Sequence, residues 1–233
     1  MTAQTDDSKS ERLALIRPLF GLDVALALYD PQGDLPLPLP EEAACLSPNA
    51  VSKRRREFAA GRAAARAAMA DLGLPPCAIP VGPKRAPVWP TGVTGSITHT
   101  RSCAAAVAAL PGEDLRALGI DVEEDTPLEN KLIPSICSPR EQDWLKRQEN
   151  PGQMAKVIFS AKEAAYKCQY AISERFFGFD GMELELDTAR GHFLAEFTGE
   201  QPPFAKGTKI AGCYAIGAGL ITTGAELRTG GLQ

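Results

Sequence analysis

Apolar runs and apolar–polar alternation along the chain predict an α+β protein. Strands are expected where short stretches alternate or run apolar, at residues 21–29, 103–110, 118–123, 182–187, 192–197 and 213–221. Longer stretches free of internal proline predict helices at residues 48–72, 139–149 and 153–172. Both ends of the chain, residues 1–12 and the last dozen, are polar or rich in Gly and Thr and are expected to be loose.

The segment Phe159–Lys167 is the most informative of the predicted helices. Ala, Lys and Glu favour a helix, and neither Gly nor Pro interrupts the segment. Glu163 and Lys167 are four residues apart, so they share one face and can pair. Taken alone, this pattern fits an ordinary surface ion pair worth about 0.3–0.5 kcal/mol.

The segment Leu118–Glu123 is an expected strand that carries acids. Because alternate residues of a strand face the same side, Asp121 and Glu123 point together while their apolar neighbours point into a core. Two carboxylates that face each other repel unless a cation lies between them. With Glu163 as a third carboxylate, the set becomes an all-oxygen site that suits Mg²⁺. The two segments together favour a metal site at Asp121, Glu123 and Glu163.

Composition narrows the class of protein. The 233 residues form one large domain or two small ones. The net charge of −4 disfavours a general nucleic-acid binder. No apolar run reaches the ~18 residues of a membrane span, and the polar first residues do not resemble a signal peptide. The six cysteines form no C-x-x-C pair, which fits a reducing, cytoplasmic location.

Basic residues concentrate in the first long helix. Between residues 52 and 66 the sequence has one acid, Glu57, and six basic residues. The basic residues are Lys53, Arg54, Arg55, Arg56, Arg62 and Arg66. A solvated basic face and a phosphate-binding face fit this pattern equally well.

The two halves of the chain resemble each other in sequence. Residues 21–24 match residues 119–122, and residues 58–66 match residues 159–167 at nearly the same spacing. Arg62 then aligns with Glu163. Chance similarity between Ala-rich helices is the alternative, but the shared order favours a pseudo-dimer of two similar α/β halves, residues 1–112 and 113–233. A site at their interface would combine acids for a metal with cations for phosphate.

Four motifs together resemble one family. Gly119–Glu123 fits G-[IV]-D-x-E, and Phe159–Lys167 fits [FW]-[ST]-x-K-E-[AS]-x-x-K. Arg54–Arg62 fits R-R-x-E-F-x-x-x-R, and Gly95–His99 fits G-S-[IL]-[ST]-H. The chain thereby resembles the 4′-phosphopantetheinyl transferase superfamily, in its larger, pseudo-dimeric branch that includes surfactin-type enzymes and enterobactin synthase component D.

The resemblance implies an activity. Such an enzyme transfers 4′-phosphopantetheine from coenzyme A to a serine of an apo carrier protein and releases adenosine 3′,5′-bisphosphate. Asp121, Glu123 and Glu163 would hold Mg²⁺, with Mn²⁺ as an alternative. Glu163, or a water it orients, would act as base, and Lys167 would contact a phosphate oxygen.

The resemblance also implies a coenzyme A site and a set of partners. The residues expected to contact coenzyme A are Arg54, Arg62, Lys84, Arg85, Ser96, His99 and Lys162. Arg55 and Arg56 are left open because the local register is ambiguous. The partner would be an acyl, peptidyl or aryl carrier protein, with no nucleic acid and no membrane, and the enzyme would be a cytoplasmic monomer with internal pseudo-symmetry.

Two other functions fit parts of the pattern. A Mg²⁺-dependent phosphodiesterase or nucleotidyl transferase could use the same three acids. A non-enzymatic RNA- or carrier-binding module could use the basic helix, although the net negative charge and the acidic trio argue against it.

Overall fold

Two antiparallel sheets lie side by side in the computed structural model, which describes residues 2–112 and 114–229. The first sheet has the order β1-β3-β2, and its strands are β1 (Ala25–Tyr29), β2 (Thr94–His99) and β3 (Ala104–Ala109). The second has the order β4-β8-β7-β6-β5, and its strands are β4 (Leu115–Glu124), β5 (Met182–Asp187), β6 (His192–Phe197), β7 (Lys209–Gly217) and β8 (Leu220–Arg228). Together with the helices, these sheets confirm the predicted α+β class.

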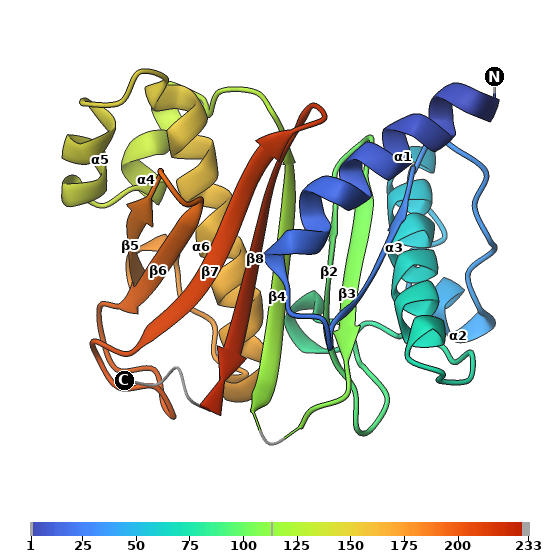
Figure 1. The fold of residues 1–233 in the computed structure, drawn as a ribbon. Helices are drawn as coiled ribbons and strands as arrows, with labels where there is room; N and C mark the ends of the chain where they lie inside the picture. Colours follow the sequence, from blue (N-terminus) through green and yellow to red (C-terminus); the bar gives the residue numbers. More distant parts are fainter. Residues whose placement is uncertain (1, 113, 230–233) are drawn as a thin grey trace.

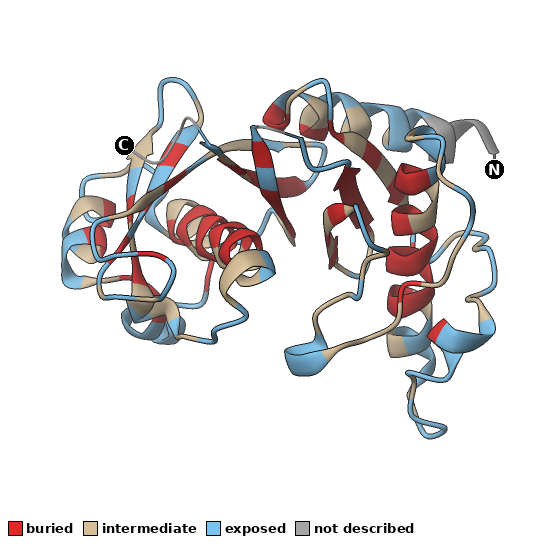
Figure 2. Cartoon of the chain, turned by 90° about the horizontal axis from the view of Figure 1, so that it is seen from below, coloured by how far each residue is buried: buried red, intermediate tan, exposed pale blue. Residues whose placement is uncertain are grey.

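Each sheet is covered by one long helix. Helix α3 (Ser52–Asp71) packs on the first sheet, and helix α6 (Pro151–Ser173) packs on the second. Figure 2 shows the buried residues of both helices on the faces that meet the sheets. On α3 this face is built from alanines, which meet the alanines of β3 and let helix and strand approach closely.

Helix α6 approaches β4 so closely that one position must be glycine. A Cβ atom built on Gly119 would lie 1.9 Å from the carbonyl oxygen of Ala164. The contact holds the middle of α6 against the acid-bearing part of β4. It therefore sets the distance between Asp121 and the residues of α6 that follow Phe159.

The edges of the two sheets meet where β2 lies beside β4. Hydroxyl groups of β2 replace a backbone ladder at this place: Ser96 Oγ accepts from Ile120 N at 3.2 Å, and Thr98 Oγ1 accepts from Val122 N at 3.3 Å. We call this boundary the β2–β4 seam. Edge strands otherwise leave their N–H groups unpaired, which is costly in a buried place.

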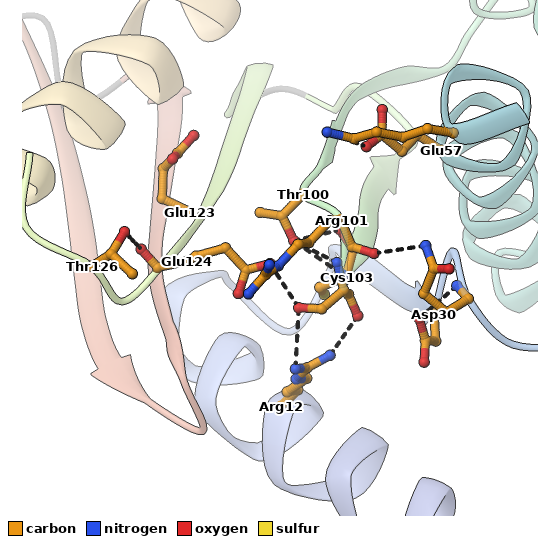
Figure 3. A network of polar contacts seen from close by, with 12 residues as sticks. Arg12, Asp30, Glu57, Thr100, Arg101, Cys103, Glu123, Glu124 and Thr126 are labelled. Carbon is orange, nitrogen blue, oxygen red and sulfur yellow. Dashed lines mark hydrogen bonds and ion pairs between the residues drawn. The ribbon is translucent and has the colours of Figure 1, made fainter. Parts of the chain in front are cut away.

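Helix α1 (Thr2–Ile16) and the turn η1 (Arg17–Leu19) lie across both sheets. Arg12 donates to the carbonyl of Ser102 at 2.6 Å, and Ser102 Oγ donates to Glu124 at 2.9 Å (Figure 3). One chain of bonds thus joins α1, the β2–β3 hairpin and β4. Beneath it, apolar residues of α1, η1, β1, β3 and β4 share one core cluster.

The connections contain six short helical segments. They are α2 (Pro40–Ala43), η2 (Pro83–Arg85), η3 (Asn130–Leu132), α4 (Ile133–Ile136), α5 (Pro139–Leu145) and η4 (Phe179–Gly181). Before α5, Glu141 N donates to Ser138 Oγ at 3.2 Å and Ser138 N donates to Glu141 Oε2 at 2.6 Å, which together form a capping box. Within the described residues, no helix is both long and apolar enough to cross a membrane.

Three sequence-based expectations about the elements are wrong. The expected loose start belongs to α1, and most of the expected loose end belongs to β8, although residues 230–233 lie outside the described part. The single strand expected at 213–221 is the end of β7, a turn and the start of β8. In each case packing against distant elements, which local polarity does not reveal, supplies the order.

Helix α3 also begins later than predicted. Val51, which has no side-chain cap, precedes the helix, and Ser47-Pro48 lies in a turn instead. Arg55 explains the difference, because it donates to the carbonyls of Ala50 and Pro48 and ties that turn to the helix.

Replacing Gly119 by alanine is expected to destabilise the protein strongly. The new methyl group would collide with the backbone of α6, so Gly119→Ala should lower the free energy of unfolding by about 3 kcal/mol, the upper end for overpacking. Urea unfolding followed by circular dichroism measures the change. Gly199→Ala is the control, since no atom lies within 4 Å of its added Cβ. Equal stability of the two variants would contradict the close approach.

Candidate active site

Asp121 lies at the centre of the β2–β4 seam and is 5% exposed. Its Oδ1 accepts from Lys167 Nζ at 2.7 Å and from Thr98 Oγ1 at 3.1 Å, and its Oδ2 accepts from Ser160 Oγ at 2.9 Å. Lys167 also donates to the carbonyl of Ile120 at 3.0 Å. Residues of β2, β4 and α6 therefore converge on one carboxylate.

Glu163 and Glu123 lie within the electrostatic field of Asp121. Burial raises the pKa of Glu163, Lys167 lowers it, and the charge of Asp121 raises it again. Burial and Asp121 likewise raise the pKa of Glu123, against the opposing effect of Lys156. Asp121 thus interacts electrostatically with each of the two glutamates, and a cation would relieve this repulsion.

Lysines neutralise part of this acidic group. Lys156 Nζ lies 3.3 Å from Glu123 Oε2, and Lys167 pairs with Asp121. Figure 3 shows Glu123 pointing away from its neighbour Glu124, which faces the β2–β3 hairpin instead. Across residues 2–112 and 114–229, no three His, Cys, Asp or Glu side chains are arranged closely enough to bind a metal ion. The donor set itself, three carboxylates in a half-buried place, fits a hard divalent cation.

Basic side chains gather on the other side of the seam. Arg54 Nη1 lies 3.2 Å from His99 Nε2, and His99 Nδ1 lies 3.8 Å from Glu57. Burial lowers the pKa of His99, and the charges of Arg54, Lys167 and Arg85 lower it further. Since Lys167 belongs to the acidic side and the two arginines to the basic side, His99 lies where the two groups meet.

Arg62 is a buried cation that lacks a matched anion. It is 6% exposed, its Nε has no hydrogen-bond partner among the described atoms, and its Nη2 reaches the carbonyl of Pro80 only at 3.5 Å. Burial lowers its pKa to about 10. A buried guanidinium is costly unless it is paired, so this position favours an anionic ligand.

The turn η2 carries Lys84 and Arg85 toward the second half of the chain. Lys84 Nζ lies 5.7 Å from the ring centre of Phe176, which follows α6 and is largely exposed. Both basic residues have positive φ angles, 52° and 67°, a conformation that costs energy for residues other than glycine. Burial lowers the pKa of Arg54, and the charge of Arg85 lowers it further, so Arg85 lies near Arg54. We call Arg54, Arg62, Lys84, Arg85 and His99 the basic group.

Comparisons with known proteins identify the family of this chain. The model of the 4′-phosphopantetheinyl transferase N-terminal domain matches residues 41–109, and that of the 4′-phosphopantetheinyl transferase superfamily matches residues 117–217. The chain is 36% identical over 199 residues to the 4′-phosphopantetheinyl transferase Svp of Streptomyces mobaraensis, which covers 83% of this chain and 80% of the relative. The chain belongs to the 4′-phosphopantetheinyl transferase superfamily.

Two further relatives support the assignment. PptT of Mycobacterium tuberculosis is 35% identical over 215 residues, 86% of this chain and 91% of its own. Enterobactin synthase component D of Salmonella typhi is 37% identical over 178 residues, 70% of this chain and 72% of its own. The chain is accordingly a 4′-phosphopantetheinyl transferase, an enzyme that moves the 4′-phosphopantetheine group of coenzyme A onto a carrier protein.

Two of the residues expected to bind coenzyme A are engaged elsewhere in the transferase. Lys162 is 3% exposed, and its ammonium group donates to Glu141 Oε2 and to the carbonyls of Ile136 and Phe179 at 2.8–3.0 Å. It lies on the buried face of α6 and is not brought together with the other candidates. Ser96 is 3% exposed and accepts the N–H of Ile120, so its hydroxyl belongs to the seam.

The structure separates the three consecutive arginines of the transferase. Arg54 turns to His99, whereas Arg55 holds the turn before α3 and Arg56 donates to the carbonyls of Pro31 and Gly33. Arg54 is therefore the member that joins the basic group.

Sequence reasoning missed three residues of the site. Thr98 and Ser160 hydrogen-bond Asp121, and Lys156 pairs with Glu123. The first two stand at motif positions where the family pattern asks for Ser or Thr, which is a signal that a hydroxyl is needed. Lys156 lies before the motif and carries no such signal.

Arg62 and Arg66 are expected to affect stability in opposite directions. With no ligand bound, Arg62→Met should raise the free energy of unfolding by about 1–2 kcal/mol, because it removes a buried cation that lacks a matched anion. Arg66→Met should lower it by about 3–5 kcal/mol, because it leaves the fully buried Glu42 without its ion pair. Thermal and urea unfolding measure both. A loss of stability in Arg62→Met as large as that in Arg66→Met would show that Arg62 is a structural residue.

Proposed function

We propose that the transfer of 4′-phosphopantetheine takes place at the β2–β4 seam, between two similar halves, residues 1–112 and 113–233. Asp121 carries this proposal: it lies on the edge strand of one sheet and is bonded by Thr98 from the edge strand of the other. The basic group lies in the first half and the acids in the second. A ligand that carries both phosphates and a bound cation would contact both.

Three acids would hold the divalent cation of the transferase, Mg²⁺ or alternatively Mn²⁺. They are Asp121, Glu123 and Glu163, and in its absence burial and the charge of Asp121 raise the pKa of both glutamates. When bound, the cation neutralises charge on the pyrophosphate of coenzyme A. Lys156 and Lys167, which pair with two of these acids, neutralise the same carboxylates when the cation is absent.

The basic group would bind the phosphates of coenzyme A. Arg62 offers an unpaired Nε donor in a buried place, and Arg54, with His99 beside it, presents a second guanidinium. Lys84 and Arg85 extend the group toward the second half. Guanidinium groups suit phosphate because two parallel N–H donors match two oxygens. A substrate with a 3′-phosphate and a pyrophosphate supplies the anions that these cations lack.

The chemical step joins the carrier serine to phosphorus. The serine oxygen attacks the phosphorus that bears pantetheine, its proton leaves, and the bond to adenosine 3′,5′-bisphosphate breaks. Glu163, directly or through a water that it orients, would accept the proton. Lys167, one helical turn away, would contact a phosphate oxygen of the reacting group.

The remaining expectations concern the cellular location, the oligomeric state and the carrier protein of the transferase. Six free cysteines fit a reducing, cytoplasmic location, and internal pseudo-symmetry would let a single chain form the whole site as a monomer. A panel of apo carriers from fatty-acid, polyketide and nonribosomal-peptide systems identifies the partner. The enterobactin relative makes a siderophore carrier the first to try.

Glu163→Gln is expected to remove nearly all transfer and to leave the fold intact. The amide keeps the size of the side chain but neither binds a cation as a carboxylate does nor accepts the serine proton. Mass spectrometry of an apo carrier incubated with coenzyme A and Mg²⁺ measures the gain of one 4′-phosphopantetheinyl group. Glu174→Gln, an exposed position at the end of α6, is the control. Activity of Glu163→Gln within a few-fold of the wild type would exclude the proposed roles. Hydrolysis of coenzyme A without carrier modification would instead indicate a phosphodiesterase.

Arg62→Met is expected to raise the KM for coenzyme A more than the KM for 3′-dephospho-coenzyme A. Only the former substrate carries the 3′-phosphate that Arg62 is proposed to bind. Steady-state kinetics with both substrates separate the effects, and an equal change in the two KM values would reject the assignment of Arg62 to the 3′-phosphate.

A further inference from the structure

The hydroxyl of Thr98 performs two tasks at the seam. It accepts the N–H of Val122 at 3.3 Å, so its single proton is available for donation. That proton points to Asp121 Oδ1 at 3.1 Å. One side chain of the first half therefore bonds both the backbone and the functional carboxylate of β4, and it is 5% exposed.

A second hydroxyl holds the other oxygen of the same carboxylate. Ser160 Oγ, on α6, donates to Asp121 Oδ2 at 2.9 Å and lies 2.9 Å from Thr223 Oγ1. Thr223, on β8, donates in turn to the carbonyl of Ser160 at 2.9 Å. Both carboxylate oxygens thus have hydroxyl donors, from β2 and α6, that fix the plane of the carboxylate.

Ser96 shows that the seam does not need the contact with Asp121. It makes the same backbone bond as Thr98, two residues earlier on the same face of β2, but its hydroxyl is bonded to no carboxylate in the described structure. Ser96 therefore joins the two strands without contacting Asp121, whereas Thr98 both joins the strands and bonds Asp121.

We propose that Thr98 is a positioning residue, which orients Asp121 for the divalent cation and couples the half that binds the nucleotide to the half that bears the acids. The proposal rests on the cation site proposed above. Through its neighbour His99, which meets Arg54, the same strand reaches the basic group. Loss of the hydroxyl leaves Lys167 and Ser160 as the remaining donors to Asp121, so the carboxylate is held less firmly and binds the cation less tightly.

The affinity for Mn²⁺, measured by titration calorimetry in the presence of coenzyme A, tests the proposal. Thr98→Val keeps the shape and removes the hydroxyl; it should weaken Mn²⁺ binding about 10–100-fold, as loss of a partner behind a metal ligand does. Thr98→Ser should restore binding to within a few-fold of the wild type. Binding of coenzyme A in EDTA should be nearly equal in all three proteins.

Thr222→Val is the matched control. Thr222 is a fully buried threonine of β8 whose hydroxyl donates to the carbonyl of Ala215 and not to Asp121. It should bind Mn²⁺ as the wild type does. Should Thr98→Val prove too unstable to purify, Ser160→Ala removes the donor to the other oxygen and should give the same weakening.

The outcomes separate this proposal from the one it rests on. If the wild type binds Mn²⁺, Asp121→Asn does not, and Thr98→Val binds as tightly as the wild type, the role of Thr98 is overturned while the cation site stands. Equal weakening in Thr98→Ser or in Thr222→Val would also overturn it, because the hydroxyl next to Asp121 would not be the cause. If the wild type itself binds no Mn²⁺ with coenzyme A, the proposed cation site fails and this inference fails with it.

Discussion

The structure depends on how two sheet edges meet without a backbone ladder between them. Strands β2 and β4 lie side by side, and two N–H groups of β4 find hydroxyl oxygens of Ser96 and Thr98 instead of carbonyls. A continuous ladder would have merged the sheets into one rigid surface. Side-chain bonds satisfy the same donors and leave the functional side chains of both strands at the boundary.

Two groups of partly buried charged side chains flank this boundary. On one side, burial and mutual repulsion raise the pKa of Glu123 and Glu163 around Asp121. On the other, Arg62 is buried without a matched anion. Each arrangement is unfavourable alone, and the proposed ligand, which brings phosphates and a cation together, would relieve both.

Close packing between α6 and β4 fixes where the side chains of α6 lie relative to Asp121. The carbonyl of Ala164 passes so near Gly119 that no side chain fits between α6 and β4. Ser160, Glu163 and Lys167 lie on the helix at and around this contact, so their distances from Asp121 follow from backbone packing. On the other face of the same helix, Lys162 donates to Glu141 and to two backbone carbonyls in the core.

The sequence alone determined which chemical groups are present and on which elements they lie. The spacing of Asp121, Glu123, Glu163 and Lys167 predicted an acidic strand and a Lys-Glu helix, and β5 and β6 agree with the predicted strands residue for residue. These features depend on local periodicity, which a single segment reveals. Only the tertiary structure decided which of several similar residues reach the site. It turned Arg54 toward His99 and Arg56 toward a loop, buried Lys162 and gave Thr98 its bond to Asp121. It also placed residues 2–16 in α1 and residues 220–228 in β8. The reason is that these outcomes depend on contacts between segments far apart in the chain, whose geometry no local pattern contains.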